Sequence, residues 1–104
     1  MQENLNGKLL IITAPSGAGK TSITKYLMKL FPQLAFSVSA ATRAPRAHET
    51  NGVDYHFLST EDFQQKIQNN EFIEWEMVYE GKYYGTLKSE LQRIWQNNQV
   101  PVLD

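Results

Sequence analysis

The stretch KLLIITAPSGAGKT, residues 8–21, decides the fold, because an apolar run leads directly into a glycine-rich turn that ends in lysine and threonine. The run at 8–13 shows no clear alternation of polar and apolar residues, which predicts a strand buried on both faces of a parallel sheet. Residues 14–21 match the P-loop pattern, except that Ala14 stands where the first glycine usually does. Apolar residues then recur at helical spacing before Pro32, at Ile23, Tyr26, Leu27, Leu30 and Phe31. The chain is therefore expected to open as a strand, a phosphate-binding turn and a helix.

A P-loop in this setting binds the phosphates of a nucleoside triphosphate. Its glycines let several backbone N–H groups point inward, and the positive end of the following helix dipole faces the same place. We expect Lys20 to contact the β- and γ-phosphates during catalysis and the Thr21 hydroxyl to coordinate Mg²⁺. The predicted ATP-binding residues are Ala14, Pro15, Ser16, Gly17, Ala18, Gly19, Lys20 and Thr21. The plainer alternative is a turn with a solvated lysine, and a P-loop alone does not identify the acceptor.

Further along the chain, strands and helices alternate around one irregular segment. The expected strands lie at 35–39, 54–58, 71–79 and 100–103. The expected helices run from Glu61 to about Asn69, with Thr60 as the cap, and from Leu87 to about Asn98. Residues 40–53 lack apolar periodicity, which predicts a functional loop. This order predicts an α/β fold whose parallel sheet needs more chain for its crossovers and cover, so we expect the sequence to be incomplete.

Composition limits the classes of function. The 104 residues allow one compact domain, and a formal net charge of −1 gives no general attraction to nucleic acid or to an anionic membrane. Because the chain has no cysteine, disulfides, thiolate-bound metals and a thiol nucleophile are excluded. The longest apolar run, 9–12, is too short to span a membrane, and the first eight residues do not resemble a signal peptide. We expect a cytoplasmic protein whose partners are neither nucleic acids nor membranes.

A resemblance to a known family becomes specific in three segments. They read FSVSAATRAPRAHETNGVDYHF at 36–57, FIEWE at 72–76 and YYGT at 83–86. With the P-loop and the final VLD, they occur in the order and near the spacing of the guanylate kinase family, which the chain resembles along essentially its whole length. The resemblance implies a P-loop kinase-type parallel sheet with an inserted, mostly β GMP-binding module, and transfer of a phosphoryl group from ATP, with Mg²⁺, to GMP. It divides the chain into a P-loop part at 1–36, the GMP-binding module at 37–86 and a returning helix and strand at 87–104.

The chemistry of the residues agrees with this resemblance. Arg43 and Arg46 lie three residues apart beside a proline, and two guanidinium groups suit a phosphate monoester dianion. Glu74 can accept from the N1–H and N2–H donors that guanine presents and adenine lacks. The resemblance implies that Tyr55 and Tyr84 donate to the same phosphate and that Ser39 and Thr86 contact the base. The predicted GMP-binding residues are Ser39, Arg43, Arg46, Tyr55, Glu74, Tyr84 and Thr86, and the predicted catalytic residues are Lys20, Arg43 and Arg46.

Other positions are less regular. Asp104 ends an apolar strand, where P-loop enzymes present an acid to Mg²⁺, often through water. Ala41 stands where the family usually has threonine, and His48 replaces a common glycine. His48 and His56 could suggest a metal pair, but no further nitrogen or sulfur ligand stands at a fixed spacing. Taken singly, the arginines could be solvated, the tyrosines could be core residues and Glu74 could face solvent on an edge strand.

Two other functions fit parts of the pattern. Guanylate-kinase-like domains of membrane-associated scaffolds bind proteins, but they typically lack a working P-loop and often carry proline at the position of Ser39. A different small-molecule P-loop kinase would not need the TRAPR segment or Glu74. Whole guanylate kinases are roughly twice this length. We therefore expect an N-terminal fragment with little or no activity alone, whose exposed sheet would favour self-association.

Overall fold

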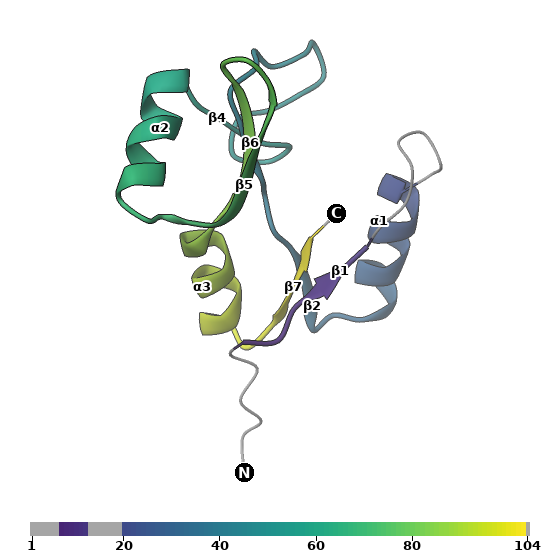
Figure 1. The fold of residues 1–104 in the computed structure, drawn as a ribbon. Coiled ribbons are helices and arrows are strands. Elements are labelled where there is room, and N and C mark those ends of the chain that lie inside the picture. Colours follow the sequence, from purple (N-terminus) through teal and green to yellow (C-terminus); the bar gives the residue numbers. More distant parts are fainter. Residues whose placement is uncertain (1–6, 13–19, 104) are drawn as a thin grey trace. The chain divides into compact units, whose positions relative to one another are not determined.

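The computed structural model describes residues 7–12 and 20–103, with the backbone alone for Lys20 and Thr21. The chain divides into two compact units. The terminal unit comprises Met1–Ser37 and Leu91–Asp104, and the central unit comprises Val38–Glu90. Figure 1 follows the chain through both units by colour. No helix among the described residues is long and apolar enough to cross a membrane.

The terminal unit is built on a parallel sheet, as the sequence predicts. Its strands, in the order β1-β7-β2, are Leu10–Ile11, Val100–Leu103 and Leu34–Phe36. β7 pairs in parallel with both neighbours, so it is the middle strand. Helix α1, Lys20–Leu30, lies between β1 and β2 in the sequence and ends before Pro32, which cannot continue a helix. The largest fully buried apolar side chains of this unit are Leu91, Ile94, Pro101 and Val102.

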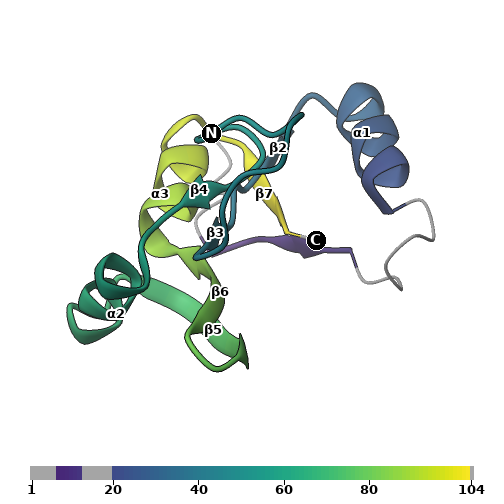
Figure 2. The same cartoon turned by 90° about the horizontal axis from the view of Figure 1, so that it is seen from above.

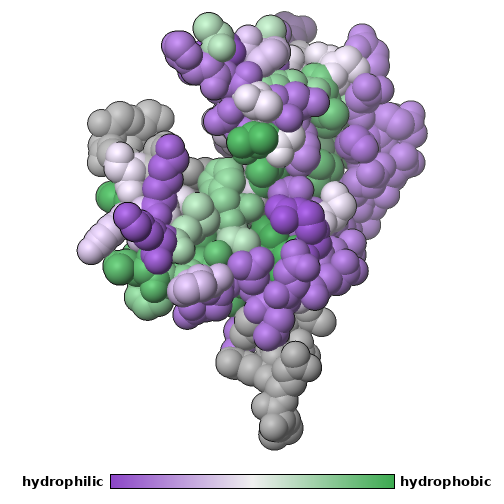
Figure 3. Space-filling view, turned by 180° about the vertical axis from the view of Figure 1, so that it is seen from behind, coloured by the Kyte–Doolittle hydropathy of each residue, from purple (hydrophilic) through white to green (hydrophobic). Residues whose placement is uncertain are grey.

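The first strand is less buried than predicted. Leu10 is 38% exposed and Ile11 is 59% exposed, because β1 lies at the edge of the sheet and, among the described residues, pairs with β7 alone. The apolar positions of α1 are also open to solvent, namely Ile23, Tyr26, Leu30 and, just after the helix, Phe31. Figure 3 shows green apolar surface on the side where α1 lies. The prediction of a strand buried on both faces is therefore wrong for the described residues.

The central unit contains a four-stranded sheet in the order β4-β3-β6-β5. In that order the strands are His56–Phe57, Ala40–Ala41, Lys82–Leu87 and Phe72–Tyr79. β5 and β6 form an antiparallel hairpin whose turn contains Gly81 at φ 74°, a left-handed conformation that glycine adopts without a steric penalty. β3 pairs antiparallel with β6 and parallel with β4. Helix α2, Thr60–Gln68, lies beside the hairpin in both Figure 1 and Figure 2.

The beginning of the predicted loop at 40–53 is a strand. Ala40 and Ala41 form β3 and are 0% and 2% exposed. Alanine is weakly disfavoured in strands, so the sequence carried no local sign of this element. The strand forms because its backbone pairs on both sides, with β4 and with β6. The irregular part of the segment therefore begins after Ala41.

Helix α2 has a different cap from the predicted one. The Ser59 hydroxyl oxygen accepts the backbone N–H of Asp62 at 3.1 Å, which makes Ser59 the N-cap. Thr60, the predicted cap, is the first helical residue, and its hydroxyl donates to the carbonyl oxygen of Gly81 at 3.0 Å. The other predicted helix is confirmed with shifted ends as α3, Lys88–Gln96, which begins in the central unit and continues into the terminal unit.

Stacked aromatic rings fill the core of the central unit. Phe63 of α2 is fully buried, and its ring centroid lies 4.3 Å from that of Phe72 and 5.2 Å from that of Tyr83. Ala40 and Leu87 complete the buried cluster. Successive residues of a strand point to opposite faces, so the inward position of Tyr83 directs the next residue of β6 to the face away from α2. That second face carries the candidate site.

Candidate functional site

The face of the central sheet away from α2 brings together most of the predicted GMP-binding residues. Glu74 pairs with Thr86 across β5 and β6, and residues opposite each other share a face. The β3–β6 register, continued by one residue, brings Ser39 opposite Thr86. The ring of Tyr55 lies 5.5 Å from the ring of Tyr84, edge to face. Five of the seven predicted residues therefore share this face.

A threonine orients the carboxylate of Glu74. Thr86 Oγ1 donates a hydrogen bond to Glu74 Oε1 over 2.7 Å. Thr86 is 3% exposed, whereas Glu74 lies in an exposed stretch of β5. A carboxylate has about four acceptor sites, so this bond fixes the direction of Glu74 and leaves most of its acceptor capacity for a ligand.

Gly85 sets the distance between the two strands at this point. A Cβ atom added at Gly85 would lie 2.8 Å from the backbone oxygen of Glu74 and 2.9 Å from Cβ of Trp75. Such contacts are shorter than van der Waals contact, so a larger residue would force β5 away from β6. The close approach that joins Glu74 to Thr86 therefore depends on glycine.

Arg43 forms a cluster with the two tyrosines. Its Cζ atom lies 4.9 Å from the ring centroid of Tyr55 and 5.6 Å from that of Phe57. A guanidinium held over aromatic faces is attracted to their π electrons. Since Tyr55 also contacts the ring of Tyr84, the guanidinium and the two tyrosine rings form one connected cluster. Arg43, Tyr55 and Tyr84 are each partly buried, which limits the screening of their charges and dipoles by water.

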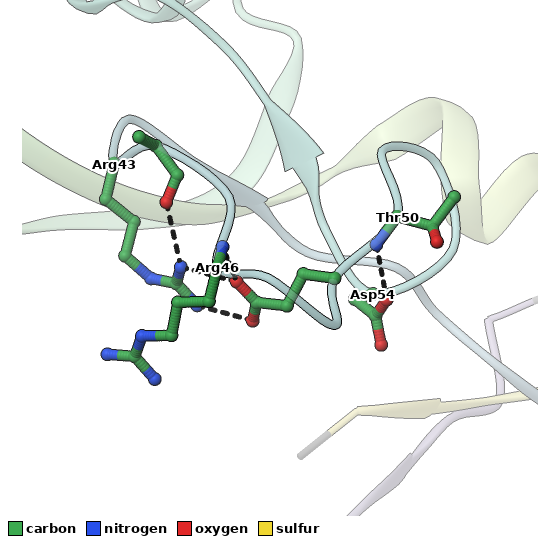
Figure 4. Close-up of polar contacts among 6 residues, drawn as sticks. Arg43, Arg46, Thr50 and Asp54 are labelled. Carbon is green, nitrogen blue, oxygen red and sulfur yellow. Dashed lines mark hydrogen bonds and ion pairs between the residues drawn. The ribbon is translucent and has the colours of Figure 1, made fainter.

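Glu49 binds Arg43 from within the same loop. Nη1 and Nη2 of Arg43 donate to Oε1 and Oε2 of Glu49 at 2.7 and 2.8 Å, and Nη1 also donates to the carbonyl oxygen of Ala44 at 3.1 Å. The backbone N–H of Arg46 donates to Glu49 Oε1 at 2.8 Å (Figure 4). The bonds from Arg43, followed by that from Arg46, lower the pKa of Glu49 from 4.5 to about 2. The same ion pair raises the pKa of Arg43.

The Arg46 side chain lies apart from this cluster. It is exposed, and within the part of the chain that the structure describes its guanidinium has no hydrogen-bond or ion-pair partner. In Figure 4 no dashed line reaches the Arg46 guanidinium. A second acid, Asp54, holds the end of the loop by accepting the backbone N–H of Thr50 at 2.7 Å. The structure therefore brings Arg43 together with the tyrosines but not Arg46.

Glu49 is not among the predicted site residues, although it binds Arg43. A signal was present, because Glu49 is the only acid between residues 40 and 53 and lies three residues after Arg46 and six after Arg43. In a loop with two arginines, a single acid is the expected ion-pair partner.

The predicted ATP side falls mostly outside the described residues. The predicted residues outside the described part of the chain are Ala14, Pro15, Ser16, Gly17, Ala18, Gly19 and Asp104. Lys20 and Thr21 are the first two residues of α1, and their side chains are not described either. The neighbouring backbone is described. Ile11 pairs with Leu103, and the N–H of Ile12 donates to the Leu103 carbonyl oxygen at 2.8 Å. The carboxyl ends of β1 and β7 are therefore adjacent, and the predicted P-loop follows one while Asp104 follows the other.

The histidines do not form a metal site in the described part of the chain. His48 is exposed, and His56 contacts Glu90, with 3.2 Å between Nε2 and Oε2. Within residues 7–12 and 20–103 there is no group of three or more His, Cys, Asp or Glu side chains that could hold a metal ion.

Comparisons with known proteins point to one family. The family model described as guanylate kinase matches residues 6–104. The guanylate kinase of Bacteroides thetaiotaomicron is 47% identical over 102 residues, covering 98% of this chain and 50% of the relative. That of Porphyromonas gingivalis is 52% identical over 98 residues, covering 93% of this chain and 52% of the relative. The chain spans about half the length of the curated relatives it matches.

A solved structure agrees in fold. The crystal structure of guanylate kinase from Anaplasma phagocytophilum matches with a TM-score of 0.71 at 32% sequence identity. The match covers 93% of this chain and 47% of that one. The α/β architecture with its parallel sheet, predicted from the sequence, is confirmed by this likeness.

Proposed function

Because the chain belongs to the guanylate kinase family, we propose that the protein transfers a phosphoryl group from ATP to GMP, giving ADP and GDP. The observation that carries the proposal is one face of the central sheet and the loop beside it, where Arg43, Tyr55 and Tyr84 form one cluster and Glu74 and Thr86 form another. The first cluster suits a phosphate and the second suits guanine, which are the two ends of GMP. We also infer a cytoplasmic protein that acts on nucleotides and binds neither nucleic acid nor membranes.

The phosphate end combines charge with neutral donors. A guanidinium has five N–H groups, and the bonds of Arg43 to Glu49 and Ala44 leave some of them for a ligand. Glu49 offsets the charge of Arg43, so the exposed Arg46 would supply the positive charge that attracts a phosphate dianion. The phenol groups of Tyr55 and Tyr84 would donate further hydrogen bonds to it.

The base end depends on one oriented carboxylate. Guanine presents two parallel donors, N1–H and N2–H, and a carboxylate can accept both. Thr86 holds Glu74 in one direction, which lowers the entropy that base binding would cost. Adenine has an acceptor at N1, which would face the negative charge of Glu74. Ser39, opposite Thr86, would add a hydroxyl contact to the base.

On the ATP side, Ala14 to Thr21 would bind the phosphates and Lys20 would contact the transferring group. Thr21 and Asp104 would hold Mg²⁺ there, since hydroxyl and carboxylate oxygens are ligands that this ion prefers. The adjacent ends of β1 and β7 support this pairing of segments. When bound, Mg²⁺ would offset the negative charge of the phosphates.

The chain's own contribution to the reaction would be positional and electrostatic. Lys20, Arg43 and Arg46 would bring two anions together and neutralise charge on the transferring phosphoryl group. No side chain is required as a nucleophile, because the GMP phosphate attacks directly.

The test is a coupled ADP-release assay on the whole gene product, with GMP or AMP as acceptor. We expect turnover with GMP and at least about a hundredfold lower kcat/KM with AMP, since adenine offers Glu74 an acceptor at N1 in place of a donor. Lys20→Ala should abolish turnover while GMP still binds. Equal rates with GMP and AMP would contradict the proposed acceptor, and GMP binding without turnover would indicate a binding module.

A further inference from the structure

A buried carboxylate that the proposed reaction does not use links two segments of the central unit. Glu90, in the first turn of α3, is 8% exposed. Its Oε1 accepts the backbone N–H of Val38 at 2.8 Å, and its Oε2 lies 3.2 Å from Nε2 of His56. Val38 is buried as well. Glu90 thus contacts the backbone just before β3 and the side chain of the first residue of β4.

A carboxylate at this position carries a cost that an apolar residue would avoid. Removing its charge from water is unfavourable unless hydrogen bonds replace the lost hydration. Val38 and His56 provide two such bonds, and the positive end of the α3 dipole favours the charge in the first helical turn. An apolar side chain could fill the same space at a lower cost in free energy, so the use of a carboxylate here points to the two segments that its hydrogen bonds join.

Both bonds lie next to residues of the proposed GMP site. Val38 directly precedes Ser39, and His56 directly follows Tyr55. The N–H of His56 also donates to the carbonyl oxygen of Ser39 at 2.8 Å, so the two segments are joined at this level. A shift of either segment would therefore move the Ser39 hydroxyl or the Tyr55 phenol relative to the other.

We propose that Glu90, together with His56, is a positioning residue for GMP binding. It fixes the spacing between Ser39, which would contact the base, and Tyr55, which would contact the phosphate, and its burial keeps it from touching the nucleotide itself. This inference rests on the proposed function. If the role of Glu90 were purely structural, its loss would lower the stability of the fold but would not raise the KM for GMP more than the KM for ATP.

The experiment compares steady-state kinetics of the whole gene product in five forms. These are the wild type, Glu90→Ala, Glu90→Gln, His56→Ala and the control Glu61→Gln. Glu61 is an exposed acid in the first turn of α2, so the control removes the same charge from the same turn of another helix in the same unit. The measured quantities are the KM for GMP, the KM for ATP and kcat.

Glu90→Ala should raise the KM for GMP about tenfold, the effect of one lost charge-assisted hydrogen bond, while the KM for ATP changes less than about twofold. Glu90→Gln should raise the KM for GMP less than Glu90→Ala does, because the amide oxygen of glutamine can still accept the Val38 N–H. His56→Ala should give a rise of about threefold, and the control should match the wild type. If Glu90→Ala does not fold, the Glu90→Gln and His56→Ala variants decide the matter.

A second measurement tests whether Glu90 acts through Tyr55. Tyr55→Phe removes only the phenol hydroxyl. This change should weaken GMP binding less in the Glu90→Gln background than in the wild type, because a misplaced hydroxyl contributes less to binding. Additive effects, an unchanged KM for GMP in every variant, or equal rises in both KM values would overturn the inference. A wild type that does not phosphorylate GMP refutes the proposed function and this inference together, whereas an active wild type with unaffected variants refutes the inference alone.

Discussion

At the scale of single residues, the proposed selection of guanine would depend on Glu74. Glu74→Gln replaces one acceptor oxygen by an NH₂ group that would face the guanine donors. We expect the preference for GMP over IMP, which lacks the N2 amino group, to fall by about tenfold or more. The ratio of kcat/KM values for GMP and IMP measures this. Glu76→Gln removes the same charge two residues along the strand and should leave the ratio within about twofold.

The glycine opposite Trp75 is expected to be indispensable for the hairpin. Gly85→Ala would place a methyl group 2.8 Å from the Glu74 carbonyl oxygen, and overpacking of this kind costs about 1–3 kcal/mol. Chemical denaturation of the whole gene product should show this loss together with weaker GMP binding. Gly52→Ala is a useful comparison, because no atom lies within 4 Å of its added Cβ and only the strain of φ 83° applies. A Gly85→Ala variant with unchanged stability would contradict the packing argument.

The ion pair of Glu49 predicts a pH dependence of the loop. The pKa of Glu49 is about 2 in the folded protein and 4.5 ordinarily, so the folded state binds its proton less tightly than the unfolded state. The stabilisation by Glu49 is therefore complete above pH 4.5 and is lost as the pH falls through 2. The amide resonance of Arg46, which bonds Glu49, should titrate with a midpoint near 2 and should not titrate in Glu49→Gln. A midpoint near 4.5 would show that the pair is absent in solution.

At the scale of elements, two adjacent hydroxyl residues at the start of α2 have different roles, because Ser59 caps the helix and Thr60 does not. Ser59→Ala removes the N-cap and should lower the free energy of unfolding by about 1 kcal/mol, whereas Ser59→Asp should retain most of it. Thermal or urea unfolding measures both. An unchanged stability in Ser59→Ala would mean that Thr60 caps the helix, as its sequence position first indicated.

The sequence predicted the elements whose signal is local. The α1 helix was predicted from apolar spacing before Pro32, and β5 and β7 were predicted as the strand-like segments 71–79 and 100–103. β3 could not be predicted in this way, because Ala40 and Ala41 become a strand only through partners that lie on β4 and β6. The exposure of Leu10 and Ile11 also could not be predicted from the local sequence. An apolar run indicates a preference for burial but does not show which elements pack against it.

The sequence proposed members for the candidate site but could not predict how they are arranged. Motif order suggested Arg43, Tyr55, Glu74 and Tyr84, and in the structure these four lie on the face of the central sheet away from α2 or beside it. The contact of Arg43 with Glu49 depends on how the loop folds back over six residues, which spacing alone does not fix. The separation of the Arg46 side chain from the cluster also depends on how the loop folds and could not be predicted from spacing.

At the scale of the whole molecule, the open apolar surface of the terminal unit predicts association. The 104-residue chain prepared alone should show little or no turnover and should sediment as oligomers at rising concentration, because exposed apolar patches associate in water. Tyr26→Glu, on the exposed apolar side of α1, should reduce this association, while Lys25→Glu should not. Sedimentation velocity over a concentration series measures the difference, and a monomer at every concentration would contradict the prediction.

The pairing of β1 with β7 has a consequence for the order of folding during synthesis. Ile11 leaves the ribosome early, but the terminal sheet can form only after Leu103 has been synthesised, because β7 lies between β1 and β2. The central unit, Val38–Glu90, is one uninterrupted stretch of chain and contains all the partners of its own sheet. Contacts between distant residues form late because their loops cost entropy to close. The nascent chain can therefore acquire its proposed GMP-recognition surface while the strand that precedes its predicted P-loop is still unpaired.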